Sequence, residues 1–209
     1  MADPIVPVAP SLPLATQTYD PRNIEQITRV LRLYFRQLDA FDQTILQKIL
    51  ALETSVYEIS YGSFYDTTDQ FAAVANTAYG MTFNTTDTVA TSGFSIGSPT
   101  SRIYTDRTDV YNIQFSAQLL SNSGGTHTVW IWFRKNGTDI ADSTTKVTVE
   151  GNNTAVVAAW NYVLQLNATD YFEIMWASND THVYLHEEAA TGLHPRIPSV
   201  ILTVTKFNN

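Results

Sequence analysis

Cysteine is absent from this 209-residue chain, and histidine occurs only four times. Without cysteine the protein has no disulfide bonds, no thiolate nucleophile and no cysteine-ligated metal site. With so little histidine, arrangements of a nucleophile with its general base are scarce. The composition therefore favours a structural or binding protein over an enzyme, and we expect no enzymatic activity and no cofactor.

Long apolar runs are also missing, since no stretch approaches the roughly 18–20 residues that span a membrane. The N-terminus does not resemble a signal peptide, because Asp3 stands where a basic region is expected and prolines interrupt the apolar stretch. We expect no membrane span.

Charge is scarce and unbalanced. Charged residues make up 15% of the chain and hydrophobic residues 44%, which is typical of a globular protein. The net charge of −8 argues against nucleic acid as the main partner. The length suits one good-sized domain with additional segments.

Four prolines recur at every third position near the N-terminus, in "PIVPVAPSLP" from Pro4 to Pro13. This period matches the three residues per turn of polyproline II, and proline has no N–H for a helix or sheet interior. We predict an extended arm over residues 1–20. It is either a disordered leader or an anchor that docks on a partner, and the apolar residues between its prolines favour the anchor: Ile5, Val6, Val8, Leu12 and Leu14.

A helical pattern follows over residues 21–56. Asp20 suits the N-cap and Pro21 the first helical position. Apolar residues alternate at steps of three and four over three heptads, which is typical of a short coiled coil: Ile24, Ile27, Leu31, Tyr34, Leu38, Phe41 and Ile45. The pattern fails at Lys48. The alternative is an amphipathic helix packed on its own domain.

Arginine is ordered on the same helix. Arg22, Arg29 and Arg36 are seven residues apart, at the outward position of the heptad, and Arg32 is close by. Such a stripe is either a solvated face or a contact with an acidic partner surface, and we include these three arginines among the anchoring residues.

From residue 57 to the end, the hydrophobic period changes to two. "VYNIQFSAQLL", "AWNYVLQL", "FEIMW" and "PSVILTVTKF" alternate as strands, and Asn136-Gly137 is a strong hairpin signal. Turns recur without helices between them. The segment is thus predicted to be an all-β antiparallel sandwich or jelly roll.

One predicted strand, "TVWIWF", is apolar on both faces. Val129, Ile131 and Phe133 alternate with Trp130 and Trp132. The outer face of a two-layer sandwich meets only water, so two tryptophans there would form a large apolar patch. We predict that Trp130 and Trp132 lie at a subunit interface.

These stretches resemble the jelly roll of the complement-component-1q/tumour-necrosis-factor-like family, particularly its versions in bacteriophage virion proteins. The resemblance is carried by "DVYNIQFSAQL", "VWIWFRKNGTDI", "WNYVLQLNATDYFEIMWAS" and "PSVILTVTKF". Asp109 replaces the glycine that usually opens the central strand, and the heptad helix takes the place of a collagen stalk. The resemblance implies a homotrimer.

Candidate chemistry is sparse. His182 and His186 would lie about 13 Å apart along a strand, which is too far for one metal ion. Glu187 and Glu188 are adjacent, so in a strand they point to opposite faces. "SNSGGT" reads as a turn and not as a phosphate loop. We expect no metal site.

Two functions remain as hypotheses. The first is a trimeric capsid decoration (cement) protein on the virion exterior, anchored by its arm and helix to the major capsid protein or a tail adaptor. The alternative is the receptor-binding tip of a short tail fibre, with a host surface glycan or protein as its partner in host attachment.

Overall fold

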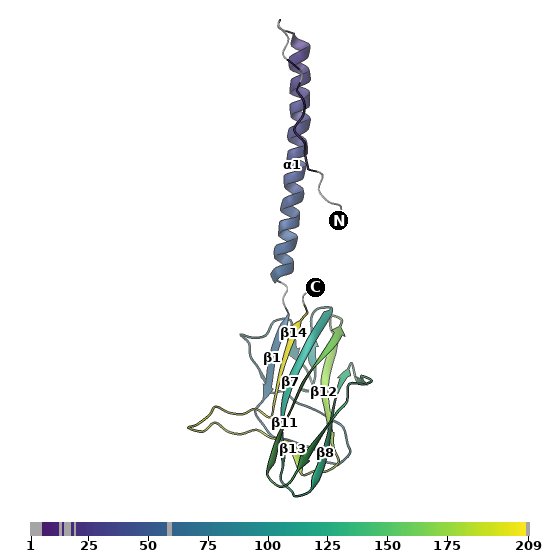
Figure 1. Ribbon diagram of the computed structural model, residues 1–209, viewed down its shortest axis with the longest axis vertical. Helices are drawn as coiled ribbons and strands as arrows, with labels where there is room; N and C mark the ends of the chain where they lie inside the picture. The colour runs from purple at the N-terminus through teal and green to yellow at the C-terminus, as the bar shows by residue number, and fades with distance from the viewer. Residues whose placement is uncertain (1–5, 13, 15–17, 19, 58–59, 208–209) are drawn as a thin grey trace. The chain divides into compact units, whose positions relative to one another are not determined.

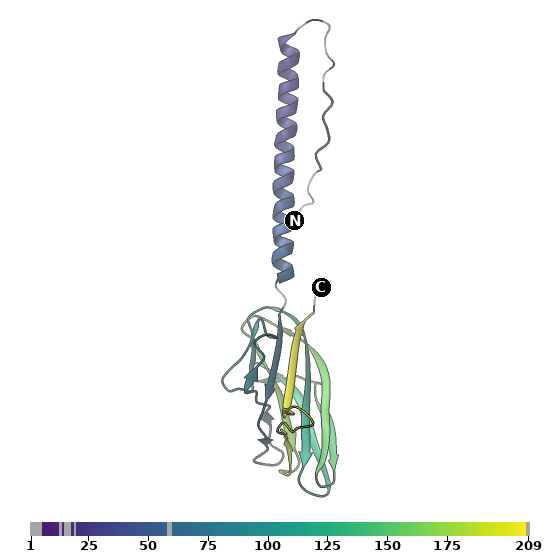
Figure 2. The ribbon, with the colours of Figure 1, turned by 90° about the vertical axis from the view of Figure 1, so that its left-hand side faces the viewer.

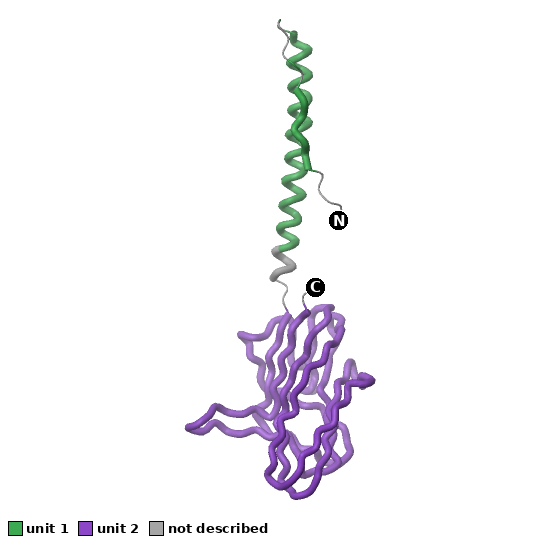
Figure 3. Tube along the Cα trace, viewed as in Figure 1, with its two compact units in different colours: residues 1–58 green, residues 59–209 purple. Residues whose placement is uncertain are grey.

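A computed structural model describes residues 6–12, 14, 18, 20–57 and 60–207 of the chain. It divides the chain into two compact units, Met1–Glu58 and Ile59–Asn209 (Figure 3). We describe each unit by itself. The predicted anchoring residue Ile5 lies outside the described residues.

The first unit consists of the arm and a single helix, α1 (Pro21–Tyr57). The arm's described residues belong to no helix or strand, and residues 6–12 follow an extended path in Figure 2. The carboxylate of Asp20 accepts a hydrogen bond from the N–H of Arg22 at 2.9 Å, and its carbonyl accepts one from Asn23 at 3.1 Å. The predicted N-cap is therefore confirmed, and Pro21 occupies the first helical position because its missing N–H costs nothing there. No described helix is long and apolar enough to cross a membrane.

The second unit is built from two antiparallel sheets (Figures 1 and 2). Sheet A contains β1 (Tyr61–Asp66), β2 (Gln70–Phe71), β4 (Thr85–Thr86), β7 (Asp109–Ser121), β11 (Thr154–Leu166), β13 (Val183–Leu185) and β14 (Val200–Lys206). Sheet B contains β3 (Tyr79–Gly80), β5 (Phe94–Ile96), β6 (Ile103–Thr105), β8 (Thr126–Lys135), β9 (Thr138–Asp139), β10 (Thr145–Glu150) and β12 (Tyr171–Ser178).

The long strands alternate between the sheets. The chain passes from β7 in sheet A to β8 and β10 in sheet B, back to β11, across to β12 and finally to β14. Within sheet A, β7 pairs with β11 along one edge and with β14 and β13 along the other. Strands that are distant in sequence are thus neighbours in each sheet, as in a jelly roll. The predicted fold class, a mainly β antiparallel jelly roll preceded by one helix, is confirmed.

The core lies between the two sheets. The predicted alternation is confirmed on β7 and β8, where Ile113, Ile131 and Phe133 are inaccessible to solvent. On β12 the predicted inward residue Trp176 is buried, but so are residues of the other side such as Met175. Burying side chains of this size stabilises the fold by roughly 1.5–3 kcal/mol each. The apolar residues that alternate along each strand therefore form the core between the sheets.

The hairpin between β8 and β9 turns at Asn136-Gly137. Both residues have positive φ, 48° and 81°, which is the left-handed region that the tight hairpin turn requires. The hairpin signal in the sequence is thus confirmed. The side-chain oxygen Oδ1 of Asn136 accepts a hydrogen bond from the N–H of Tyr171 at 2.9 Å, which connects this turn to the start of β12.

Candidate assembly and docking surfaces

The outward surface of sheet A, which we call face A, carries no charged side chain on its four main strands, all of which are fully described. The inward residues of these strands are buried and the alternating residues point outward. The outward residues are Tyr61, Ser63 and Tyr65 on β1, Val110, Asn112, Gln114, Ser116, Gln118 and Leu120 on β7, Ala155, Val157, Ala159, Asn161, Val163 and Gln165 on β11, and Ile201, Thr203 and Thr205 on β14.

Gln114 lies at the centre of face A, between Thr203 on β14 and Asn161 on β11. A hollow of about 210 Å³ lies on the β14 side of Gln114, and one of about 290 Å³ lies on its β11 side. The side chains of Gln114, Ser116 and Thr203 make no hydrogen bond within the described part of the chain. Their donors and acceptors are therefore free for a partner.

The residues on face A suit a protein interface. The central parts of interfaces are depleted of charge, because a charge that loses water without gaining a partner is costly. Small outward residues such as Ala155 and Ala159 let another surface approach closely, and Val157 and Val163 are about half exposed, at 56% and 49%. In a chain of net charge −8, a sheet face without charge is the strongest candidate for a self-association surface.

Strand β11 extends this surface around the edge of the sandwich. It pairs with β7 alone among the described strands, so its second edge is open. Trp160 and Tyr162 point inward but are only half-buried. The Trp160 ring meets Phe115 edge-on at 4.6 Å, and the Tyr162 ring stacks on Phe133 at 4.9 Å. The alternation of "AWNYVLQL" puts both on one side of the strand, and their partial exposure follows from β11 being an edge strand.

Trp130 and Trp132 lie on the opposite side, on the outward surface of sheet B, which we call face B. Both are half-buried within the single chain. The Trp132 indole donates a hydrogen bond to Asp139 at 2.8 Å, and its cross-strand neighbour Met175 is 3% exposed. Lys146 and Ala177 flank Trp130 on the neighbouring strands. That these tryptophans lie at a subunit interface stays a prediction.

Face B carries several charged groups. Arg134 lies 2.7 Å from the Asp139 carboxylate, and hydrogen bonds from Arg134 and then from Trp132 lower the pKa of Asp139. Glu173 is 7% exposed and accepts a hydrogen bond from Ser101 at 2.6 Å, with Arg102 at 4.0 Å. Face B thus pairs several of its charged groups within the chain.

On α1, the predicted heptad residues from Ile27 to Ile45 are half-buried, and Ile24 is 49% exposed. That a trimer covers this seam stays a prediction. The helix also exposes apolar side chains outside the seam, at fractions near one half: Leu33, Phe35, Leu46, Ile49 and Leu50. A strict search for heptads overlooks these residues, although a helix that is apolar on several sides requires partners on several sides.

The described apolar residues of the arm are exposed. Val6, Val8, Leu12 and Leu14 have exposed fractions from 49% to 92%. Besides the bonds at Asp20, the side-chain amide of Asn23 donates a hydrogen bond to the Leu14 carbonyl of the arm, at 3.2 Å. The anchoring residues Arg22, Arg29 and Arg36 are exposed on α1.

The titratable side chains after β13 form pairs. His186 lies 3.1 Å from Asp69, and Glu187 accepts a hydrogen bond from Arg196 at 2.6 Å. Glu188 lies 3.3 Å from His194. These pairs brace the loop that projects between β13 and β14 (Figure 1). Among the described residues no group of three or more His, Asp or Glu side chains could hold a metal ion.

Comparisons with known proteins give likenesses to solved structures and none to a protein family or curated protein. The structure of Eiger TNF from S. frugiperda aligns with 72% of this chain and 94% of its own, with 11% sequence identity and a TM-score of 0.47.

Proposed function

We propose that the protein is a homotrimeric structural protein of a bacteriophage virion, which decorates the exterior of the capsid. One observation carries the self-association: face A is uncharged in an acidic chain, and its central polar groups are unpaired within the described residues. A second copy of the chain is always present at the same concentration as the first, so it is the simplest partner for face A. The Ile and Leu heptads of α1 support a trimer, because they would bring three helices together.

The virion setting is supported by the sequence resemblance to phage jelly rolls. In this setting the arm and helix anchor the trimer to the major capsid protein or a tail adaptor. The exposed side chains of Val6, Val8, Leu12 and Leu14 require such a cover, and each contributes roughly 1.5–3 kcal/mol if it is fully buried. Ordering the chain offsets much of this gain, so three arms acting together provide the strength.

No catalytic step belongs to the proposal. The acidic residues near the histidines pair with them or with Arg196, and no cofactor is required.

The test is a deletion of the residues before Thr18. We expect the shortened protein to keep the mass of a trimer by light scattering and to lose attachment to purified particles in a co-sedimentation assay. Attachment equal to that of the full chain, or a monomer in both proteins, would contradict the proposal.

A receptor-binding tip of a tail fibre is the alternative, and one aromatic pair favours it. The Phe71 ring stacks on Tyr184 at 4.7 Å and is 57% exposed, and His186 meets Tyr184 edge-on at 5.6 Å. An exposed ring beside polar groups is suited to stacking against a sugar. The number of copies per particle separates the two functions, because decoration requires hundreds and a fibre requires tens.

A further inference from the structure

Positive charge is concentrated on the N-terminal half of α1. Between Pro21 and Gln37 the chain has four arginines and one glutamate, although the whole chain has 12 basic against 20 acidic residues. Arg29, Arg32 and Arg36 are exposed, and none of them forms an ion pair within the described residues. The rest of the chain is acidic, so this patch is electrostatically distinct.

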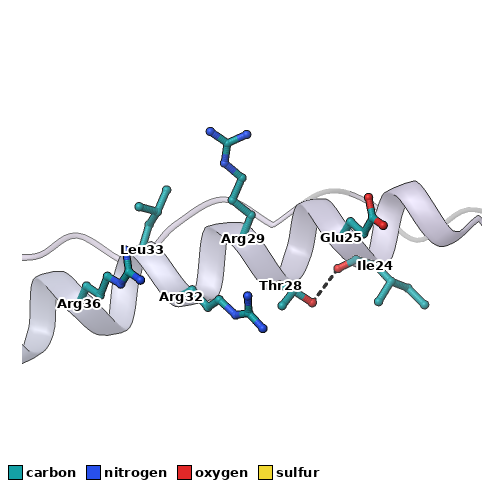
Figure 4. A pocket seen from close by; sticks show the side chains of 7 residues that line it. All are labelled: Ile24, Glu25, Thr28, Arg29, Arg32, Leu33 and Arg36. Carbon is teal, nitrogen blue, oxygen red and sulfur yellow. Dashed lines mark hydrogen bonds between the residues drawn. The ribbon is translucent and has the colours of Figure 1, made fainter.

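The patch is hollowed. Arg29, Arg32 and Arg36 line a groove of about 560 Å³ together with Ile24, Glu25, Thr28 and Leu33 (Figure 4). The Thr28 hydroxyl is already used, since it donates to the Ile24 carbonyl at 2.8 Å. The guanidinium groups are therefore the free donors of the groove, and Ile24 and Leu33 are its apolar walls, 49% and 52% exposed.

The arginines of the groove lie on the side of the helix opposite the heptad seam, and Ile24 at the start of the seam also borders the groove. With 3.6 residues per turn, the directions of Arg29, Arg32 and Arg36 average about 180° from that of the seam. Three helices that associate through Leu31 and Leu38 would therefore keep the arginines of all three grooves open to solvent. Self-association and docking in the groove are compatible.

We propose that this arginine groove binds an acidic segment of a partner protein, in which carboxylates alternate with apolar residues. Planar guanidinium groups hold carboxylates through paired hydrogen bonds, and the side chains of Ile24 and Leu33 take the apolar residues. A nucleic acid fits less well, because Glu25 lies among the arginines and would repel a continuous line of phosphates. The partner's place in a virion rests on the proposed function, whereas the acidic chemistry rests on the groove.

The experiment uses the full chain and a fluorescein-labelled 12-residue peptide of glutamates with leucine at every third position. We expect saturable binding by anisotropy at low salt that weakens as salt rises. The triple variant Arg29→Gln/Arg32→Gln/Arg36→Gln should bind the peptide about tenfold more weakly, since exposed charge pairs are individually modest. The variant Arg29→Lys/Arg32→Lys/Arg36→Lys keeps the charge and should lose less affinity for the peptide than the triple glutamine variant. Lys146→Gln on β10 removes a charge elsewhere and should bind as the wild type does.

Three results overturn the proposal: no saturable binding of the peptide, equal binding by the triple glutamine variant, or tighter arginine-dependent binding of a 20-residue oligothymidine. The mass of every sample is measured by light scattering. A chain that binds the peptide as a monomer refutes the trimer and leaves the groove intact. A triple variant that loses its trimer mass places the arginines in the seam and overturns the groove.

Discussion

The two outward faces of the β unit differ in how they satisfy their own side chains. Face B carries charges: Arg134 pairs with Asp139, and Trp132 donates to the same carboxylate, whereas Lys146 on β10 is exposed and forms no ion pair among the described residues. Face A has no charge to pair, and the side chains of Gln114 and Ser116 at its centre have no partner in the described chain. A charged face is suited to solvent, whereas an uncharged face with unpaired amides and hydroxyls is suited to another protein surface.

The difference also shows that aromatic content alone does not identify an interface. Trp130 and Trp132 are the most conspicuous outward residues in the sequence, yet they lie on the face with paired charges. Face A carries two tyrosines on β1 and is otherwise made of amides, hydroxyls and aliphatic groups. Its character is a property of the combined surface and of no single residue.

The largest expected effect comes from placing a charge on face A. Gln114→Lys should weaken subunit association by about 100-fold, because the interface would bury an unpaired ammonium group. Light scattering over a range of concentrations measures the mass. Thr148→Lys puts the same charge on an exposed position of face B and should leave the mass unchanged. Equal masses for the two variants would remove face A as the interface.

A smaller effect is expected from truncation on face B. Trp132→Ala removes the hydrogen bond to Asp139 and the ring beside Met175, and should lower the free energy of unfolding by about 2 kcal/mol. Urea denaturation measures this loss, with Trp130→Ala as the comparison. A double variant, Trp130→Ala/Trp132→Ala, tests the interface. If it folds but becomes a monomer, the sequence-based prediction of an interface at these tryptophans is correct and our preference for face A is wrong.

A truncation at the open edge of β11 should lower the free energy of unfolding by somewhat less than the truncation of Trp132 does. Tyr162→Ala removes the stacking of Tyr162 on Phe133, and should cost about 1–2 kcal/mol because the ring is only half-buried. Tyr162→Phe keeps the ring and serves as the control in the same urea titration. A loss equal in both variants would mean that the hydroxyl matters and that the stacking does not.

The smallest effect is in acid. Hydrogen bonds from the Asn167 N–H, the Asn136 amide and the Lys135 ammonium lower the pKa of Asp170 to about 2. Because the folded pKa is depressed, the stabilisation is fully present above about pH 4 and is lost as pH falls towards 2. Solvent screening reduces it to about 1 kcal/mol.

Thermal unfolding between pH 2 and 5 tests this, with Asp170→Asn as the variant that should lose the acid dependence. Asp170 belongs to the sheet B side of the unit, and face A contains no carboxylate, so acid should weaken the fold more than the subunit contact. A parallel loss of trimer mass in this window would argue for carboxylates in the contact.

Several features of the fold could be predicted from neighbouring residues. The Asn136-Gly137 turn, the N-cap at Asp20 and the inward sides of β7, β8 and β12 all depend on patterns a few residues long. The heptads of α1 gave its apolar seam, but Leu33 and Phe35 lie outside any such repeat and were overlooked. The half-exposure of Tyr162 could not be predicted, because alternation identifies a strand's inner side and not its place at an edge.

The sequence by itself determined which residues of each strand share a side, since successive side chains in a strand point to opposite faces. Only the tertiary structure decided which strands lie together. Face A combines Ser116 with Ala159 and with Ile201, and the pairing of β7 with β11 and β14 brings these distant segments into register. Each strand contributes a short uncharged row that is unremarkable alone, and long-range pairing joins the rows into one uncharged surface.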